Sequence, residues 1–77
     1  MKIEILGVGC PKCRKLTANA EIAVKELNID AEIVKVADID KIVEYGVMMT
    51  PALAIDGKVV SSGKVLNKDE IKKLITN

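Results

Sequence analysis

The hydrophobic and polar positions of this chain change their spacing several times, and each change marks an expected element. Residues 2–8 are rich in Ile and Leu and alternate loosely, which predicts a strand in the interior of a sheet. Pro11 suits the first position of a helix, and from there apolar residues recur every three or four positions as far as Leu27. The pattern predicts an amphipathic helix that ends at Asn28, a residue type that tolerates left-handed backbone.

The middle of the chain predicts a strand followed by a short helix. Residues 31–36 have the apolar and β-branched side chains of a strand. Asp38 can cap the helix that follows, and Gly46 offers the left-handed conformation at which such a helix ends. Because the first two strands are joined through a helix, we expect them to be parallel with a right-handed crossover.

The last third of the chain predicts a hairpin and a final helix. Asp56-Gly57 separates two β-prone runs, and this dipeptide suits a tight turn between antiparallel strands. Asn67, with Glu70 three positions later, has the pattern of a capping box at the start of a helix. The expected order is therefore β-α-β-α-β-β-α, an α/β fold with a four-stranded mixed sheet flanked by helices.

Size and composition narrow the function classes. The 77 residues suffice for one domain, and we take residues 1–77 as that domain. Twelve basic and eleven acidic side chains are interspersed, and Tyr45 is the sole aromatic residue, so we do not expect a nucleic-acid partner. No uncharged run approaches the roughly 20 residues that span a bilayer, and the first residues lack the pattern of a signal peptide. We expect a cytoplasmic monomer that does not enter a membrane.

The two cysteines, Cys10 and Cys13, are the main candidates for a chemical function in this sequence. A disulfide between them closes too short a loop to stabilise the fold much, which favours a chemical use of the pair. With Pro11 as the first helical residue, Cys10 lies at the helix N-terminus, whose partial positive charge favours a thiolate. Lys12 adds a full charge beside it. We therefore expect a lowered pKa for Cys10 and a higher one for Cys13, which faces the core.

Such an asymmetric pair suits thiol–disulfide exchange. Cys10 attacks a substrate disulfide, and Cys13 then attacks Cys10 and releases the reduced substrate. The same thiols can instead bind a soft metal, so a copper or zinc carrier is the alternative function. A structural zinc site needs four ligands, however, and the chain has two cysteines and no histidine.

The position of the motif carries a family resemblance. A Cys-x-x-Cys pair that follows a first strand and opens a helix is similar to the redox motif of thioredoxin-like proteins. Its Cys-Pro-x-Cys form resembles glutaredoxins, and Thr50-Pro51 looks like the cis-proline element of the superfamily. In size and in its Gly-x-Gly-Cys-Pro-x-Cys context, the chain most resembles the short archaeal and bacterial thioredoxins called redox-active disulfide protein 2. The resemblance implies a thioredoxin-like fold whose redox centre is the Cys10–Cys13 disulfide, with no other cofactor.

The resemblance also implies roles for residues outside the motif. Pro51 is expected to be cis and to face the disulfide, and the backbone of Thr50 to pair with an extended substrate segment. Glu4 lies six residues before Cys10. Counted without gaps, it matches a buried acid that helps the proton leave the resolving cysteine of thioredoxins. The alternative for Glu4 is a surface position near the sheet end.

The resemblance finally implies partners. Protein disulfides are the expected substrates. Glutaredoxins carry a glycine pair followed by an acidic residue, which helps to hold glutathione. Here that region reads Ser61-Ser62-Gly63-Lys64, with one glycine and no acid. Glutathione is therefore not the expected reductant, and a thioredoxin-reductase-type protein is.

Overall fold

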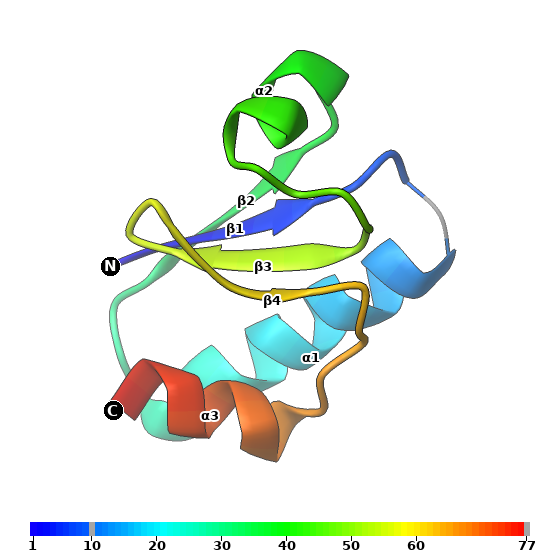
Figure 1. Ribbon diagram of the computed structural model, residues 1–77. Helices are drawn as coiled ribbons and strands as arrows, with labels where there is room; N and C mark the ends of the chain where they lie inside the picture. Colours follow the sequence, from blue (N-terminus) through cyan, green and yellow to red (C-terminus); the bar gives the residue numbers. More distant parts are fainter. Residues whose placement is uncertain (10, 77) are drawn as a thin grey trace.

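Seven elements follow one another in the predicted order (Figure 1). The computed structural model describes residues 1–9 and 11–76. The elements are β1 (Lys2–Leu6), α1 (Pro11–Leu27), β2 (Glu32–Val36), α2 (Ile39–Glu44), β3 (Ala52–Ile55), β4 (Lys58–Ser62) and α3 (Lys68–Thr76).

The four strands form one mixed sheet in the order β2-β1-β3-β4, so β1 lies in its interior. β1 is parallel to β2 and antiparallel to β3, and β3 pairs antiparallel with β4. The parallel pair and the final hairpin are thus confirmed. β1 ends at Leu6, two residues earlier than predicted. The amide of Gly7 still donates to the carbonyl of Val36, 2.9 Å away, but β2 ends there and Val8 is exposed.

Helices cover both faces of the sheet. α1 and α3 lie side by side on one face, and α2 lies on the other (Figure 1). Because successive side chains of a strand point to opposite faces of the sheet, β1 contributes residues to two hydrophobic cores. Ile3 and Ile5 pack with Leu16 toward α1 and α3, whereas Leu6 packs with Ile42 toward α2. The start of β1 and the end of α3 lie at the same end of the molecule, opposite the junction of β1 and α1 (Figure 1).

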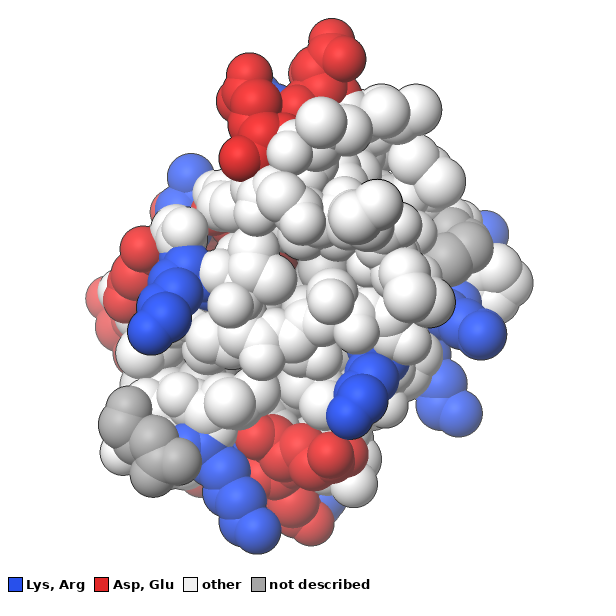
Figure 2. Space-filling model, viewed as in Figure 1, with Lys and Arg blue, Asp and Glu red and all other residues white. Residues whose placement is uncertain are grey.

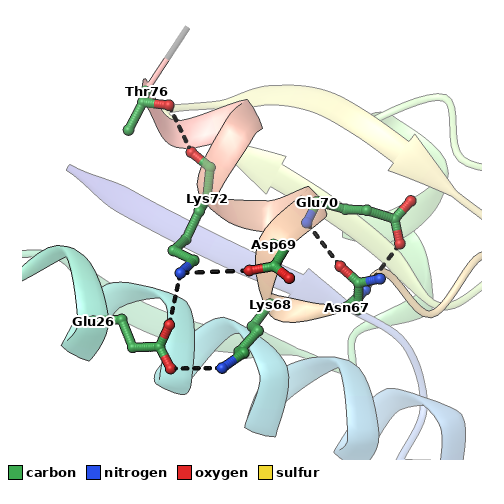
Figure 3. A network of polar contacts seen from close by, with 7 residues as sticks. All are labelled: Glu26, Asn67, Lys68, Asp69, Glu70, Lys72 and Thr76. Carbon is green, nitrogen blue, oxygen red and sulfur yellow. Dashed lines mark hydrogen bonds and ion pairs between the residues drawn. The ribbon is translucent and has the colours of Figure 1, made fainter.

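The local signals in the sequence have their expected geometry. Asn28 follows α1 with a φ of 53°, and Gly46 follows α2 with a φ of 78°. The side chain of Asp38 caps α2. At the start of α3, Asn67 Oδ1 accepts from the amide of Glu70 at 2.8 Å, and Glu70 Oε1 accepts from the amide of Asn67 at 3.1 Å (Figure 3). The predicted capping box is confirmed.

An ion-pair network joins α1 to α3. Glu26 of α1 binds Lys72 at 2.6 Å and Lys68 at 2.9 Å, and Lys72 also reaches Asp69 at 3.5 Å (Figure 3). The hydrogen bond from Lys72, followed by that from Lys68, lowers the pKa of Glu26 to about 2. The same bond to Glu26 raises the pKa of Lys72. These ion pairs therefore add to the apolar packing between α1 and α3 at its solvent-exposed edge.

The molecular surface carries both signs of charge. Figure 2 shows a face with uncharged side chains across its middle and Lys, Arg, Asp and Glu mostly around the margin. Within residues 1–9 and 11–76, no helix combines the length and the hydropathy that crossing a membrane requires.

Candidate functional site

The cysteine motif lies where β1 gives way to α1. Cys13, in the first turn of α1, is buried with 5% of its surface exposed, as expected for the residue that faces the core. Lys12 is exposed beside it. Cys10 lies outside the described residues, so its position at the helix N-terminus and its lowered pKa stay predictions, as does the influence of Lys12 on it.

Gly7 brings the strand end directly against Cys13. A Cβ added at Gly7 would lie 2.2 Å from Cys13 Sγ and 3.8 Å from Thr50 Cβ. The sulfur thus occupies the space that any other side chain at position 7 would need. The sequence analysis did not predict this contact at Gly7. A glycine that directly follows a buried strand is a signal of such a close approach.

The Thr50-Pro51 segment lies at this same place. The peptide bond between the two residues is cis, as the resemblance implied, and Pro51 is fully buried while Thr50 is exposed. The carbonyl of Pro51 accepts a hydrogen bond from the amide of Gly63 at 2.9 Å, which ties the segment to the end of β4. Because Thr50 and Cys13 both surround Gly7, the structure brings these two predicted site residues together.

Exposed apolar side chains flank the segment. Met48 is 96% exposed, and Met49 and Val8 are exposed over most of their surface. Met49 also lies over Gly63, where an added Cβ would come within 3.2 Å of Met49 Cβ. We call Val8, Met48 and Met49 the apolar rim. Its members do not fill the core, which leaves them free to contact another molecule.

Glu4 is buried, with 7% of its surface exposed, but it lies on the opposite face of the sheet from Cys13. Its carboxylate accepts a hydrogen bond from the hydroxyl of Tyr45, and this bond, with burial, raises the pKa of Tyr45. Neither expectation for Glu4 describes this position. The surface alternative is wrong because Glu4 is buried, and its carboxylate lies on the other face of the sheet from Cys13. Its influence on the cysteine chemistry stays a prediction. The β1 side chain on the face of Cys13 is Ile5.

A cavity of about 180 Å³ adjoins Cys13 on the α1 face of the sheet. Thr17 contributes one wall, and its hydroxyl donates to the carbonyl of Cys13 at 2.9 Å. Among the described lining residues, the charged side chains are Arg14 and Lys35, both cationic and both exposed. Sequence reasoning did not single out either residue.

The described part of the chain was also searched for clusters of metal ligands. Residues 1–9 and 11–76 contain no group of three or more His, Cys, Asp or Glu side chains placed to hold a metal ion.

Comparisons with known proteins agree with this geometry. Residues 1–76 match the family model described as thioredoxin domain. A thioredoxin of Methanothermobacter thermautotrophicus is 49% identical over 76 residues, which cover 99% of each chain. A thioredoxin of Methanocaldococcus jannaschii is 49% identical over 71 residues, which cover 92% of this chain and 81% of the other. The chain belongs to the thioredoxin family of thiol–disulfide oxidoreductases.

Proposed function

We propose that the chain reduces disulfides in other proteins through Cys10-Pro11-Lys12-Cys13. The observation that carries this proposal is the convergence of Cys13 Sγ and Thr50 on Gly7, beside the cis Pro51. A thiol pair next to an open stretch of backbone can hold a substrate segment while the sulfur atoms exchange.

The reaction consists of two exchanges. The Cys10 thiolate attacks one sulfur of a substrate disulfide, which forms a mixed disulfide and expels the first substrate thiolate. The Cys13 thiolate then attacks Cys10 Sγ, closes the Cys10–Cys13 disulfide and expels the second substrate thiolate. Two electrons pass from the cysteine pair to the substrate, and each expelled thiolate takes a proton from water.

Substrate contacts in this proposal come from two kinds of surface. Thr50 is exposed, and its backbone pairs with an extended substrate segment, as an added strand does. The apolar rim packs against apolar substrate side chains beside the disulfide. Methionine suits this role because its unbranched, polarisable side chain adapts to different partners.

The proposed partners follow from the family to which the chain belongs. A thioredoxin-reductase-type protein returns the Cys10–Cys13 disulfide to the dithiol, and no further cofactor takes part. Glutathione is not the reductant, because Ser61 to Lys64 lack the second glycine and the acidic residue of glutaredoxins. We propose that the chain is a monomer and that it works in the cytoplasm, where thiols are kept reduced.

The test is reduction of insulin disulfides with dithiothreitol as electron source. We expect wild type to accelerate precipitation of the insulin B chain and Cys10→Ser to be inactive. Cys13→Ser should accumulate a covalent adduct with its substrate, which mass spectrometry detects as the summed masses. Serine at each position is the matched control for the other, since both replacements remove one thiol.

Two outcomes would contradict the proposal. One is normal multiple turnover by Cys13→Ser, which would exclude the second exchange. The other is a wild-type pair that does not oxidise reversibly and purifies with stoichiometric copper or zinc, which would favour the soft-metal carrier instead. Metal content is therefore measured on the same preparation.

A further inference from the structure

The methionines of the chain lie at two ends of the molecule. Met48 and Met49 are consecutive, and they are 96% and 66% exposed. Met1 is 47% exposed and precedes β1, at the end of the molecule opposite the junction of β1 and α1 (Figure 1). An exposed thioether is open to oxidants dissolved in water, and its product, a sulfoxide, is polar. The consecutive pair is therefore a candidate modification site.

The pair lies directly beside the proposed substrate surface. Met49 precedes Thr50, the residue on the amino side of the cis proline. Thr50 Cβ and Cys13 Sγ both surround Gly7, so the two methionines adjoin the place where a substrate disulfide is expected to react. A change in the polarity of Met48 and Met49 therefore changes the surface that a protein substrate meets.

The two methionines differ in what they contact. Met49 Cε and Sδ lie 3.5 and 3.6 Å from the position of a Cβ built at Gly63. The amide of Gly63 donates to the carbonyl of Pro51, so the Met49 thioether packs on the residue that holds the cis proline segment. An oxygen on Met49 Sδ would bring a polar, branched group against Gly63. Met48 is almost wholly exposed, and an oxygen there alters the surface alone.

We propose that Met48 and Met49 form a modification site at which peroxides produce methionine sulfoxide, and that this modification lowers the affinity of the chain for protein disulfides. The inference rests on the function proposed above and adds a form of regulation to the same surface. Apolar contact and adaptability suit methionine to docking, and oxidation removes both. Neither side chain belongs to a hydrophobic core, so the fold should stay intact.

The oxidation is a transfer of one oxygen atom. The thioether sulfur attacks one peroxide oxygen, an S–O bond forms and the O–O bond breaks. The proton on the attacked oxygen passes to the departing oxygen, which leaves as water or an alcohol. The sulfur loses two electrons and the peroxide gains them. Methionine sulfoxide reductases reverse the change, which makes the modification suitable for regulation.

The test begins with protein whose Cys10–Cys13 disulfide is closed, so that the thiols are protected from peroxide. Hydrogen peroxide is added and then removed with catalase, and peptide mass spectrometry locates each sulfoxide. Dithiothreitol restores the dithiol and leaves the sulfoxides in place. Initial rates with fluorescein-labelled insulin give kcat and KM, and hydroxyethyl disulfide serves as a small substrate with little apolar surface to dock. Circular dichroism checks the fold.

We expect sulfoxides at both positions to raise KM for insulin about 3- to 10-fold, which corresponds to the burial of one or two methylene groups. The kcat for insulin and the rate with hydroxyethyl disulfide should change less than twofold. Methionine sulfoxide reductases A and B should restore KM. The matched control is Met48→Leu/Met49→Leu, in which Met1 is the one methionine left. Compared with its own untreated sample, this variant should show no rise in KM after peroxide.

Three results would overturn the inference. The first is an unchanged KM in wild type that carries both sulfoxides. The second is an equal rise in KM in Met48→Leu/Met49→Leu, which would place the effect elsewhere. The third is resistance of Met48 and Met49 to peroxide under conditions that oxidise Met1. Failure of the proposed function has a different signature, since untreated wild type would then leave insulin unreduced, and the inference would fall with it.

Discussion

Gly7→Ala probes the tightest contact at the site. The new methyl carbon would start 2.2 Å from Cys13 Sγ, whereas non-bonded atoms of this size lie about 3.5–4.0 Å apart. The sulfur or the strand end must therefore move by more than about 1 Å. Gly7 is not among the glycines with positive φ, so the variant tests space rather than backbone conformation.

The size of the effect follows from the burial of both groups. Overpacking a close-packed site costs typically 1–3 kcal/mol, and we expect Gly7→Ala to lower the free energy of unfolding by about that amount. Displacement of a reacting atom by about 1 Å can slow a reaction on the order of 100-fold. We expect the release of substrate by Cys13 to slow by roughly 10- to 100-fold in Gly7→Ala.

Urea unfolding of the reduced proteins measures the change in stability. A single-turnover reaction with Ellman's reagent measures the two exchanges, because attack by Cys10 releases one thionitrobenzoate and attack by Cys13 releases the second. Gly57→Ala is the control, because Gly57 lies in the hairpin turn with a φ of +84° and nothing within 4 Å of an added Cβ. It should cost about 1–2 kcal/mol through backbone strain alone and leave both exchange steps unchanged.

A double variant decides whether the sulfur is the cause. In Cys13→Ala the nearest remaining atom of residue 13 is its Cβ, 3.4 Å from the added carbon, which is ordinary contact. Gly7→Ala should therefore cost at least 1 kcal/mol less in the Cys13→Ala background, by the overpacking range above. An additive pair of variants would refute the steric reasoning.

Two further predictions concern the polar contacts outside the site. Tyr45→Phe removes the hydroxyl that donates to the buried Glu4, so the urea midpoint of the variant should fall below that of wild type at pH 7. Because the pKa of Tyr45 is raised in the folded protein, this difference should be complete below pH 10 and should vanish as the pH rises through the raised pKa. An unchanged midpoint would show that water replaces the hydroxyl. Glu26→Gln should destabilise the protein above about pH 4.5, and the difference should disappear as pH falls through about 2, since the pKa of Glu26 is lowered to that value. A difference that is constant across this pH range would exclude the ion pairs with α3 as its source.

Features that depend on neighbouring residues in the chain were predictable. The Asp56-Gly57 turn, the cap at Asp38 and the capping box at Asn67 each involve residues within a few positions, and local chemistry determines them. The order of elements and the parallel pairing of the first two strands followed from these signals. The cis bond before Pro51 came from the family resemblance, because cis bonds are uncommon even before proline.

The face of the sheet on which a side chain lies depends on how strands align with each other and with the helices, and this alignment could not be predicted in the same way. Counting back from Cys10 to Glu4 assumes a fixed number of residues between strand and helix. An error of one residue reverses the face on which a strand side chain lies. The structure places Ile5 on the face of Cys13 and Glu4 on the other. The cation at Lys35 was missed for a related reason, since it reaches the site through the pairing of β1 with β2.

The position of the two chain ends has a practical consequence. The start of β1 and the end of α3 lie at the same end of the molecule, across the length of the sheet from the junction of β1 and α1 (Figure 1). A tether, a surface for immobilisation or another folded module can therefore be joined at either end without covering the start of α1, where Cys13 lies. Such an arrangement keeps the surface around the start of α1 open whatever is attached at the other end of the molecule.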